Sequence, residues 1–169
     1  MSDGRLARAN VVEARVKVAH MAALAETGRI VTVGLGSCVA ITLWDKARRV
    51  GALAHVLLPE PHAGGAVENP AKFATTAVPA LEEAMRECGS RGPYVATLTG
   101  GASLFGQLLK MRGENVGGRN TAAALAALER ANIPVVGSDT GGDYGRTVTL
   151  DVADGSVTVR SVSKGTRVL

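Results

Sequence analysis

Cys38 is the side chain of this sequence best suited to act as a nucleophile. It follows the glycine-rich segment 34–37 and precedes a run rich in β-branched residues. A nucleophilic thiol needs exposure, a lowered pKa and amide donors for an oxyanion. A glycine-rich turn before a strand can supply the exposure and the amide donors. Gly36 and Ser37, with the N–H of Cys38, are therefore candidates for an oxyanion hole. The alternative is a small buried hydrophobic residue, because free cysteines are usually buried.

His55 is the candidate base for this thiol. It lies in the apolar run 53–57, where a histidine is costly unless it is hydrogen-bonded or active. In a hairpin, its strand would pair with the strand that begins at Cys38, and the two side chains could then face each other. Thr32 could hold the second ring nitrogen through its hydroxyl or its backbone carbonyl. We expect protonated His55 to lower the pKa of Cys38. The alternatives are that His55 is a hydrogen-bonded core histidine and that Thr32 is an ordinary strand threonine.

The remaining reactive side chains form no second site. Cys88 ends an apolar stripe of helical spacing that includes Leu81 and Met85, which indicates a core thiol. His62 lies in the proline-rich and glycine-rich loop 59–70, where it either lines a substrate groove or is solvated. The cysteines and histidines lack zinc-ligand spacing, and the glycine runs lack phosphate-loop spacing. We therefore expect neither a metal nor a cofactor.

Composition indicates one globular domain. The chain has 169 residues, of which 46% are hydrophobic and 3% aromatic, so an aliphatic core is expected. The net charge of +4 is spread along the chain, which argues against nucleic acid as a partner and suggests a mild preference for acidic partners. The sequence contains no apolar stretch long enough to predict a membrane span. We expect a cytoplasmic protein with a flexible segment at 1–14 and a single domain at 15–169.

The elements that must position these residues are mostly short strands. Strands are predicted at 16–18, 30–33, 38–43, 50–58, 94–98, 133–136, 147–152 and 156–162, the last two joined by a two-residue turn at Asp154-Gly155. Helices are predicted at 73–88, with a kink or break at Pro79, and at 121–131, capped by Asn120. This order favours a single-domain α/β sandwich with a mixed, mostly antiparallel sheet over a doubly wound parallel sheet.

Two segments carry a resemblance to a known family. The runs VTVGLGSCVA at 31–40 and GALAHVLLP at 51–59 resemble CheD, the chemoreceptor glutamine deamidases. The likeness covers roughly residues 15–162 and extends to the following positions: 72–74, 100–102, Asn115, Gly117, Arg119, Asn120, 139–142 and Arg146.

The resemblance implies a fold, a reaction and a site. It implies a cytoplasmic α/β sandwich related to the deamidase domain of cytotoxic necrotizing factor toxins. It implies a catalytic triad with Cys38 as nucleophile, His55 as general base and acid, and Thr32 as the orienting residue. The reaction would hydrolyse glutamine side chains on chemoreceptor helices to glutamate and release ammonia, without a metal or cofactor. Some members also act as methylesterases, and some bind the phosphatase CheC.

Two other functions stay open at this point. A non-enzymatic chemotaxis regulator would act only by binding CheC and receptors. A cysteine peptidase would pass through the same acyl-thioenzyme, so the three residues alone do not separate it from a deamidase. We expect a monomer that acts on a helical receptor segment and is a poor catalyst on free glutamine.

Overall fold

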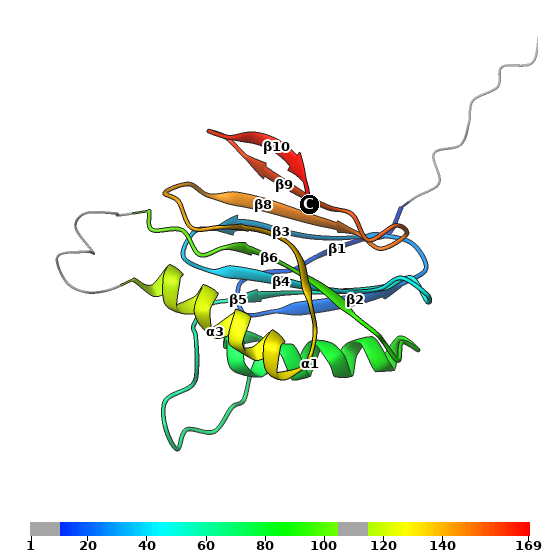
Figure 1. Ribbon diagram of the computed structural model, residues 1–169, viewed down its shortest axis with the longest axis horizontal. Coiled ribbons are helices and arrows are strands. Elements are labelled where there is room, and N and C mark those ends of the chain that lie inside the picture. Colours follow the sequence, from blue (N-terminus) through cyan, green and yellow to red (C-terminus); the bar gives the residue numbers. More distant parts are fainter. Residues whose placement is uncertain (1–10, 105–114) are drawn as a thin grey trace, which may run out of the picture.

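The computed structural model describes residues 11–104 and 115–169 and consists of three layers (Figure 1). Two five-stranded sheets stack on each other, and two helices cover the outer face of one of them. The first sheet has the order β1 (Glu13–Arg15), β3 (Arg29–Leu35), β8 (Arg146–Asp151), β9 (Val157–Ser161) and β10 (Gly165–Val168). The second has the order β2 (Met21–Ala25), β5 (Val50–Val56), β4 (Val39–Asp45), β6 (Val95–Gly100) and β7 (Val135–Thr140).

Strand pairing confirms the predicted α/β sandwich. Each sheet is antiparallel except for one parallel pair, β1 with β3 and β6 with β7. The fold contains two such sheets, although the sequence pattern suggested one.

The core is divided into two apolar layers. One lies between the second sheet and the helices α1 (Ala74–Glu87) and α3 (Val116–Arg130), and it includes Val39 and Ile41. The other lies between the two sheets and includes Cys38, Ala40 and Leu53. Because successive strand residues point to opposite faces, neighbouring positions of β4 enter different layers. This alternation places Cys38 on the face of the second sheet that lies opposite the helices.

The hairpin of β4 and β5 is confirmed, and its register matters for the site. The two strands pair antiparallel, with Ala40 opposite His55 and Val39 opposite Val56. On the other side, β4 pairs antiparallel with β6, so that Val39 lies opposite Gly100. Both strands are buried along nearly their whole length because each face of the sheet is covered.

Helix α1 runs without a break through Pro79, so of the predicted kink or break, the break is wrong. A proline removes one backbone hydrogen bond inside a helix. The buried residues Val78, Leu81 and Met85 of the same helix pack against the second sheet. That apolar burial offsets the loss of one bond and keeps the helix continuous.

Helix α3 begins earlier than predicted, and Asn120 is not its cap. Asn115 caps the helix, and its side chain accepts a hydrogen bond of 2.9 Å from the Gly118 N–H. The glycines of the first turn concealed this start because glycine is a poor helix former. Gly117 is required there, since a Cβ would lie 2.5 Å from the carbonyl oxygens of Gly101 and Ala102.

The N-terminal strands differ from the prediction. The predicted strand at 16–18 is wrong, and β1 instead occupies Glu13–Arg15, of which the first two residues belong to the segment 1–14 that was expected to be flexible. Its neighbours hold it to β3, since the Arg29 N–H donates to the Val12 carbonyl at 2.8 Å. Strand β2 was missed because Met, Ala and Leu dominate it and β-branched residues are absent.

The loop between β8 and β9 is longer than predicted. Strands β8 and β9 pair as expected, but residues 152–156 separate them, so the two-residue turn is wrong. The ring of Trp44 packs directly on Gly155 and shapes this loop. Strand β10 was also missed, because its residues are all exposed and show no alternation. None of the helices among residues 11–104 and 115–169 has the length and apolarity needed to cross a membrane.

Candidate active site

Cys38 lies directly before β4, at the end of the second sheet. Its side chain is 8% exposed and packs in the layer between the sheets with Ala40 and Leu53. The thiol is therefore nearly buried, yet it lies at the margin of the core. Cys38 thus packs as a hydrophobic side chain, and its role as nucleophile stays a prediction.

His55 and Thr32 are joined by a hydrogen bond across the two sheets. Thr32 Oγ1 lies 2.7 Å from His55 Nδ1 and also 2.7 Å from the carbonyl oxygen of Val16. A carbonyl oxygen only accepts, so the single hydroxyl proton of Thr32 goes to Val16. The hydroxyl oxygen must then accept the proton of His55 Nδ1. This arrangement fixes the tautomer of His55 and leaves Nε2 unprotonated.

Cys38 and His55 share one face of the second sheet. Ala40 is paired with His55, and Cys38 lies two residues before Ala40, so the two side chains are diagonal neighbours. His55 is fully buried, and within the described residues its Nε2 has no hydrogen-bond partner. The ring nitrogen that lacks a proton is thus the one available to the thiol. No hydrogen bond joins the two residues in this state.

Burial keeps both groups neutral at rest. Burial lowers the pKa of His55 from its ordinary value of 6.5 to about 4. Burial also raises the pKa of the Cys38 thiol, an effect that a hydrogen bond from its own backbone N–H partly offsets. The expected lowering of the Cys38 pKa by protonated His55 is therefore wrong for the resting site. The physical reason is that the first sheet packs against the face that bears both groups and excludes water, which disfavours both charged forms.

The turn before Cys38 is held through its carbonyl groups. Gly36 O accepts a hydrogen bond from the Ala102 N–H, and Cys38 O accepts one from the Gly101 N–H, both at 2.8 Å. Ser37 O accepts a hydrogen bond of 2.9 Å from the Asn120 side chain. Every carbonyl of the turn from Gly36 to Cys38 thus has a protein donor.

The N–H of Cys38 is not used by the strand ladder. In a regular antiparallel pair, Cys38 and Gly101 would exchange two hydrogen bonds, but only the one to Cys38 O forms. Gly100 and Gly101 have φ values of 101° and 65°, and the Gly101 carbonyl lies against Gly117 instead. These glycine conformations turn the partner carbonyl away. Among the described residues, the Cys38 N–H has no other backbone partner.

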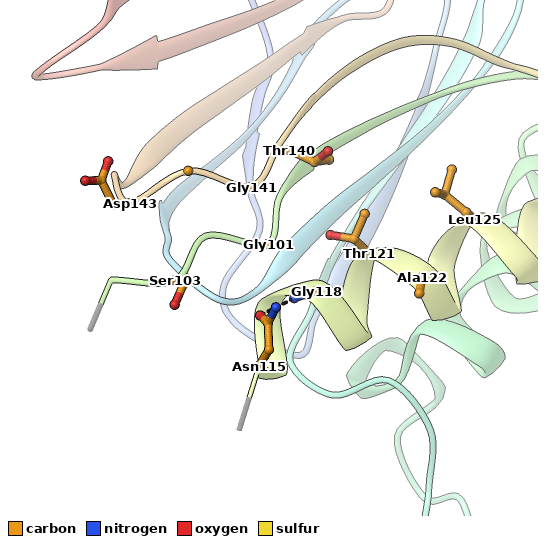
Figure 2. A pocket seen from close by; sticks show the side chains of 11 residues that line it. Gly101, Ser103, Asn115, Gly118, Thr121, Ala122, Leu125, Thr140, Gly141 and Asp143 are labelled. Carbon is orange, nitrogen blue, oxygen red and sulfur yellow. Dashed lines mark hydrogen bonds between the residues drawn. The ribbon is translucent and has the colours of Figure 1, made fainter. Parts of the chain in front are cut away.

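A groove adjoins this turn (Figure 2). It has a volume of about 670 Å³ and lies between the N-terminal half of α3 and the loop that follows β7. Its walls include Thr121 and Leu125 of α3 and Gly141 and Asp143 of the loop. Gly101 lines the groove, and its N–H donates to the Cys38 carbonyl, so the groove borders the backbone of the Cys38 turn. Most lining residues are small, which allows close approach of another backbone.

The other candidate residues lie away from the thiol. Cys88 is half-buried and packs against the core of α1, which confirms the prediction of a core thiol. His62 is exposed and lines a separate cavity of about 370 Å³ with Arg119. The described residues contain no cluster of three potential metal ligands. Asn120 is not the cap predicted from the sequence, but it is a buried polar residue that ties two loops together, as its resemblance position also suggested.

Comparisons with known proteins decide the family. A family model described as "CheD chemotactic sensory transduction" matches residues 57–161. The chain belongs to the CheD family. A relative from Clostridium kluyveri, named "Probable chemoreceptor glutamine deamidase CheD", is 38% identical over 92% of this chain and 96% of its own length.

Two further CheD relatives extend this likeness. One from Clostridium acetobutylicum with the same name is 37% identical over 95% of this chain and 97% of its own length. One from Geobacter metallireducens, named "Probable chemoreceptor glutamine deamidase CheD 2", is 46% identical over 80% of this chain and 85% of its own length. The CheD model begins at Leu57, beyond Thr32, Cys38 and His55. The alignment to the Clostridium acetobutylicum relative spans 161 residues and therefore includes all three.

Proposed function

We propose that this chain deamidates glutamine side chains of chemoreceptors, converting them to glutamate and releasing ammonia. The observation that carries the proposal is the hydrogen bond of Thr32 to His55, which leaves Nε2 unprotonated on the sheet face that also bears Cys38. The names of the CheD relatives supply the substrate class. The chemistry is that of a cysteine amidohydrolase, with Cys38, His55 and Thr32 as the triad.

Acylation begins from a neutral thiol and a neutral imidazole. His55 Nε2 takes the thiol proton as the sulfur of Cys38 attacks the carbon of the glutamine carboxamide. The carboxamide oxygen becomes an oxyanion, which the N–H of Cys38 and the turn at Gly36 and Ser37 stabilise. The imidazolium gives its proton to the nitrogen as the C–N bond breaks and ammonia leaves. Thr32 accepts from Nδ1 throughout and holds the ring in place.

Deacylation restores the enzyme. A water molecule enters the space that ammonia has left, and His55 Nε2 takes one of its protons. The hydroxide attacks the thioester carbon, and the resulting oxyanion accepts hydrogen bonds from the same N–H donors. When the C–S bond breaks, His55 returns the proton to Cys38, and the product is a glutamate side chain. These two steps together consume one water and release one ammonia.

The groove of Figure 2 supports a macromolecular substrate. Its small lining residues Thr121, Ala122 and Gly141 allow the backbone of a receptor helix to approach the Cys38 turn. Binding free energy would then come from the helix surface, so that free glutamine is a poor substrate. The net charge of +4 favours an acidic partner, and activity is expected to weaken as salt is raised. The enzyme is proposed to act as a monomer in the cytoplasm.

Ammonia release tests the proposal. A receptor cytoplasmic fragment should yield ammonia with the wild-type protein and with Cys88→Ala, but not with Cys38→Ala. Cys88 is the matched control because it is the other cysteine and packs in the core of α1. New N-termini in place of ammonia would indicate a peptidase. A folded wild-type protein that binds the fragment, or CheC, and releases no ammonia would instead be a non-enzymatic regulator.

A further inference from the structure

Asn120 is a buried polar residue that contacts the chain on both sides of the proposed site. Its side chain is fully buried in the first half of α3. Nδ2 donates one proton to Ser37 O at 2.9 Å and the other to Leu57 O at 3.0 Å. Ser37 precedes the proposed nucleophile, and Leu57 follows the strand that carries His55. One side chain therefore ties together the ends of β4 and β5.

The orientation of this amide follows from its partners. Both partners are carbonyl oxygens, which only accept, so the NH₂ group must face them. Oδ1 is left buried, and within residues 11–104 and 115–169 it has no hydrogen-bond partner. A buried acceptor without a partner lowers stability, whereas the two donated hydrogen bonds satisfy the carbonyls of Ser37 and Leu57. The amide therefore fixes the direction of both carbonyls.

The contact to Ser37 sets the direction of the Cys38 N–H. The peptide bond between Ser37 and Cys38 is trans, so its C=O and N–H point in opposite directions. Asn120 belongs to α3, which packs on one face of the second sheet, whereas Cys38 packs on the other face. Holding the Ser37 carbonyl toward the helix turns the Cys38 N–H toward the layer that contains the thiol. The glycine conformations at Gly100 and Gly101 remove the carbonyl that would otherwise accept this N–H.

We infer that Asn120 is a positioning residue that holds the Ser37–Cys38 peptide so that the Cys38 N–H is preset as the oxyanion donor. The inference rests on the proposed acyl-thioenzyme chemistry and adds a residue to it. Asn120 contacts neither the thiol nor His55 and acts only through the peptide. Its removal should slow the steps that form an oxyanion and leave the nucleophilicity of the thiol unchanged.

The test compares Asn120→Leu with a matched control. Leucine keeps the volume and lacks both donors, whereas Thr42→Val removes a buried hydrogen bond with Thr97 in the same sheet. Three rates are measured: acylation of Cys38 by p-nitrophenyl acetate, ammonia release from a receptor fragment, and alkylation by iodoacetamide. Acylation forms a tetrahedral oxyanion and alkylation does not. Asn120→Ser, which is smaller and keeps one donor, serves if the leucine variant fails to fold.

The inference predicts a split between these rates. In Asn120→Leu, acylation and the kcat of ammonia release should fall about 100-fold or more, the usual size for loss of an oxyanion donor. The KM and the alkylation rate of Asn120→Leu should match those of wild type. The acylation rate and kcat of Asn120→Ser should lie between those of wild type and Asn120→Leu. Thr42→Val should lose stability without this split. Equal acylation in Asn120→Leu and Thr42→Val, or a parallel fall in alkylation, would overturn the inference.

The two assays also separate this inference from the proposed function. A wild-type protein that p-nitrophenyl acetate acylates at Cys38, but that releases no ammonia from receptors, would contradict the proposed substrate and leave the acylation comparison intact. A wild-type protein in which neither p-nitrophenyl acetate nor receptor glutamine acylates Cys38 would contradict both the inference and the proposed function.

Discussion

Thr32 Oγ1 accepts the proton of His55 Nδ1 at 2.7 Å while it donates its own proton to the carbonyl of Val16. The hydroxyl thus serves as an acceptor toward the histidine because the carbonyl has already taken its only proton. Strand geometry holds the two side chains: Thr32 lies on β3 in one sheet, and His55 lies on β5 in the other.

Removing the hydroxyl of Thr32 should therefore impair catalysis. Thr32→Val leaves the Nδ1 proton and the Val16 carbonyl without their partner, at a cost of about 1–3 kcal/mol in folding free energy. Thr32→Ser keeps the hydroxyl and should retain more activity than Thr32→Val. The measurement is the kcat of ammonia release beside a thermal melt for each variant. Full activity in Thr32→Val would show that another group orients His55.

The reactivity of Cys38 should reflect a neutral thiol. Because burial raises its pKa, alkylation by iodoacetamide should keep increasing with pH beyond the neutral range, without a plateau near pH 7. The experiment uses Cys88→Ala, so that Cys38 is the only cysteine in the chain. A plateau that begins below neutral pH would indicate a resting thiolate–imidazolium pair, contrary to the structure.

Burial of neutral His55 should make folding stability depend on pH. Its pKa is about 4 when folded and near 6.5 when unfolded, so the unfolded chain binds more protons between these values. Stability is complete above pH 6.5 and is lost as the pH falls toward 4, by about 3 kcal/mol in total. Urea unfolding at several pH values measures this loss. The carboxylates of Asp45 and Asp139, whose pKa values are lowered from 3.8, act below this window.

His55→Gln provides the control for that experiment, because glutamine does not titrate. Its stability should change much less than that of wild type between pH 6.5 and 4. Identical pH profiles for the two proteins would contradict a buried neutral histidine.

Close packing of α3 on the turn after β6 should be needed for activity. In Gly117→Ala the new Cβ would lie 2.5 Å from the carbonyl oxygens of Gly101 and Ala102, and backbone atoms must move to admit it. We expect a stability loss of about 1–3 kcal/mol and a lower kcat, because the helix that carries Asn120 shifts away from Ser37. Thermal melts and ammonia release measure the two effects. Unchanged kcat would show that the spacing of α3 from the turn does not affect the site.

The sequence predicted the part of the site that lies on local hairpin geometry. Cys38 and His55 could be placed together because a short turn joins β4 and β5 and strand alternation fixes their face. Thr32 could be added because its β-branched strand comes just before the turn, although its position in the other sheet was not predicted. The assignment of catalytic roles to these three residues stays a prediction, as does the relationship to the necrotizing factor fold.

The parts that escaped prediction depend on distant packing. Asn120 is 83 residues from Ser37 in sequence, so its hydrogen bond depends on how α3 docks against the sheet. The neutral state of Cys38 and His55 follows from the first sheet, which covers the face of the second sheet that bears both residues. That packing cannot be inferred from their neighbours in the chain. Strand β10 carries no alternation and is defined only by its pairing with β9.

The central claim is that Cys38 converts receptor glutamine to glutamate, and mass spectrometry of a receptor cytoplasmic fragment tests it most directly. The fragment is incubated with wild-type protein or with Cys38→Ser, digested, and compared peptide by peptide. The account predicts that specific glutamines gain the mass of an amide-to-acid conversion with the wild-type protein and remain unchanged with Cys38→Ser. Unmodified glutamines in both samples, or equal conversion in both, would contradict it.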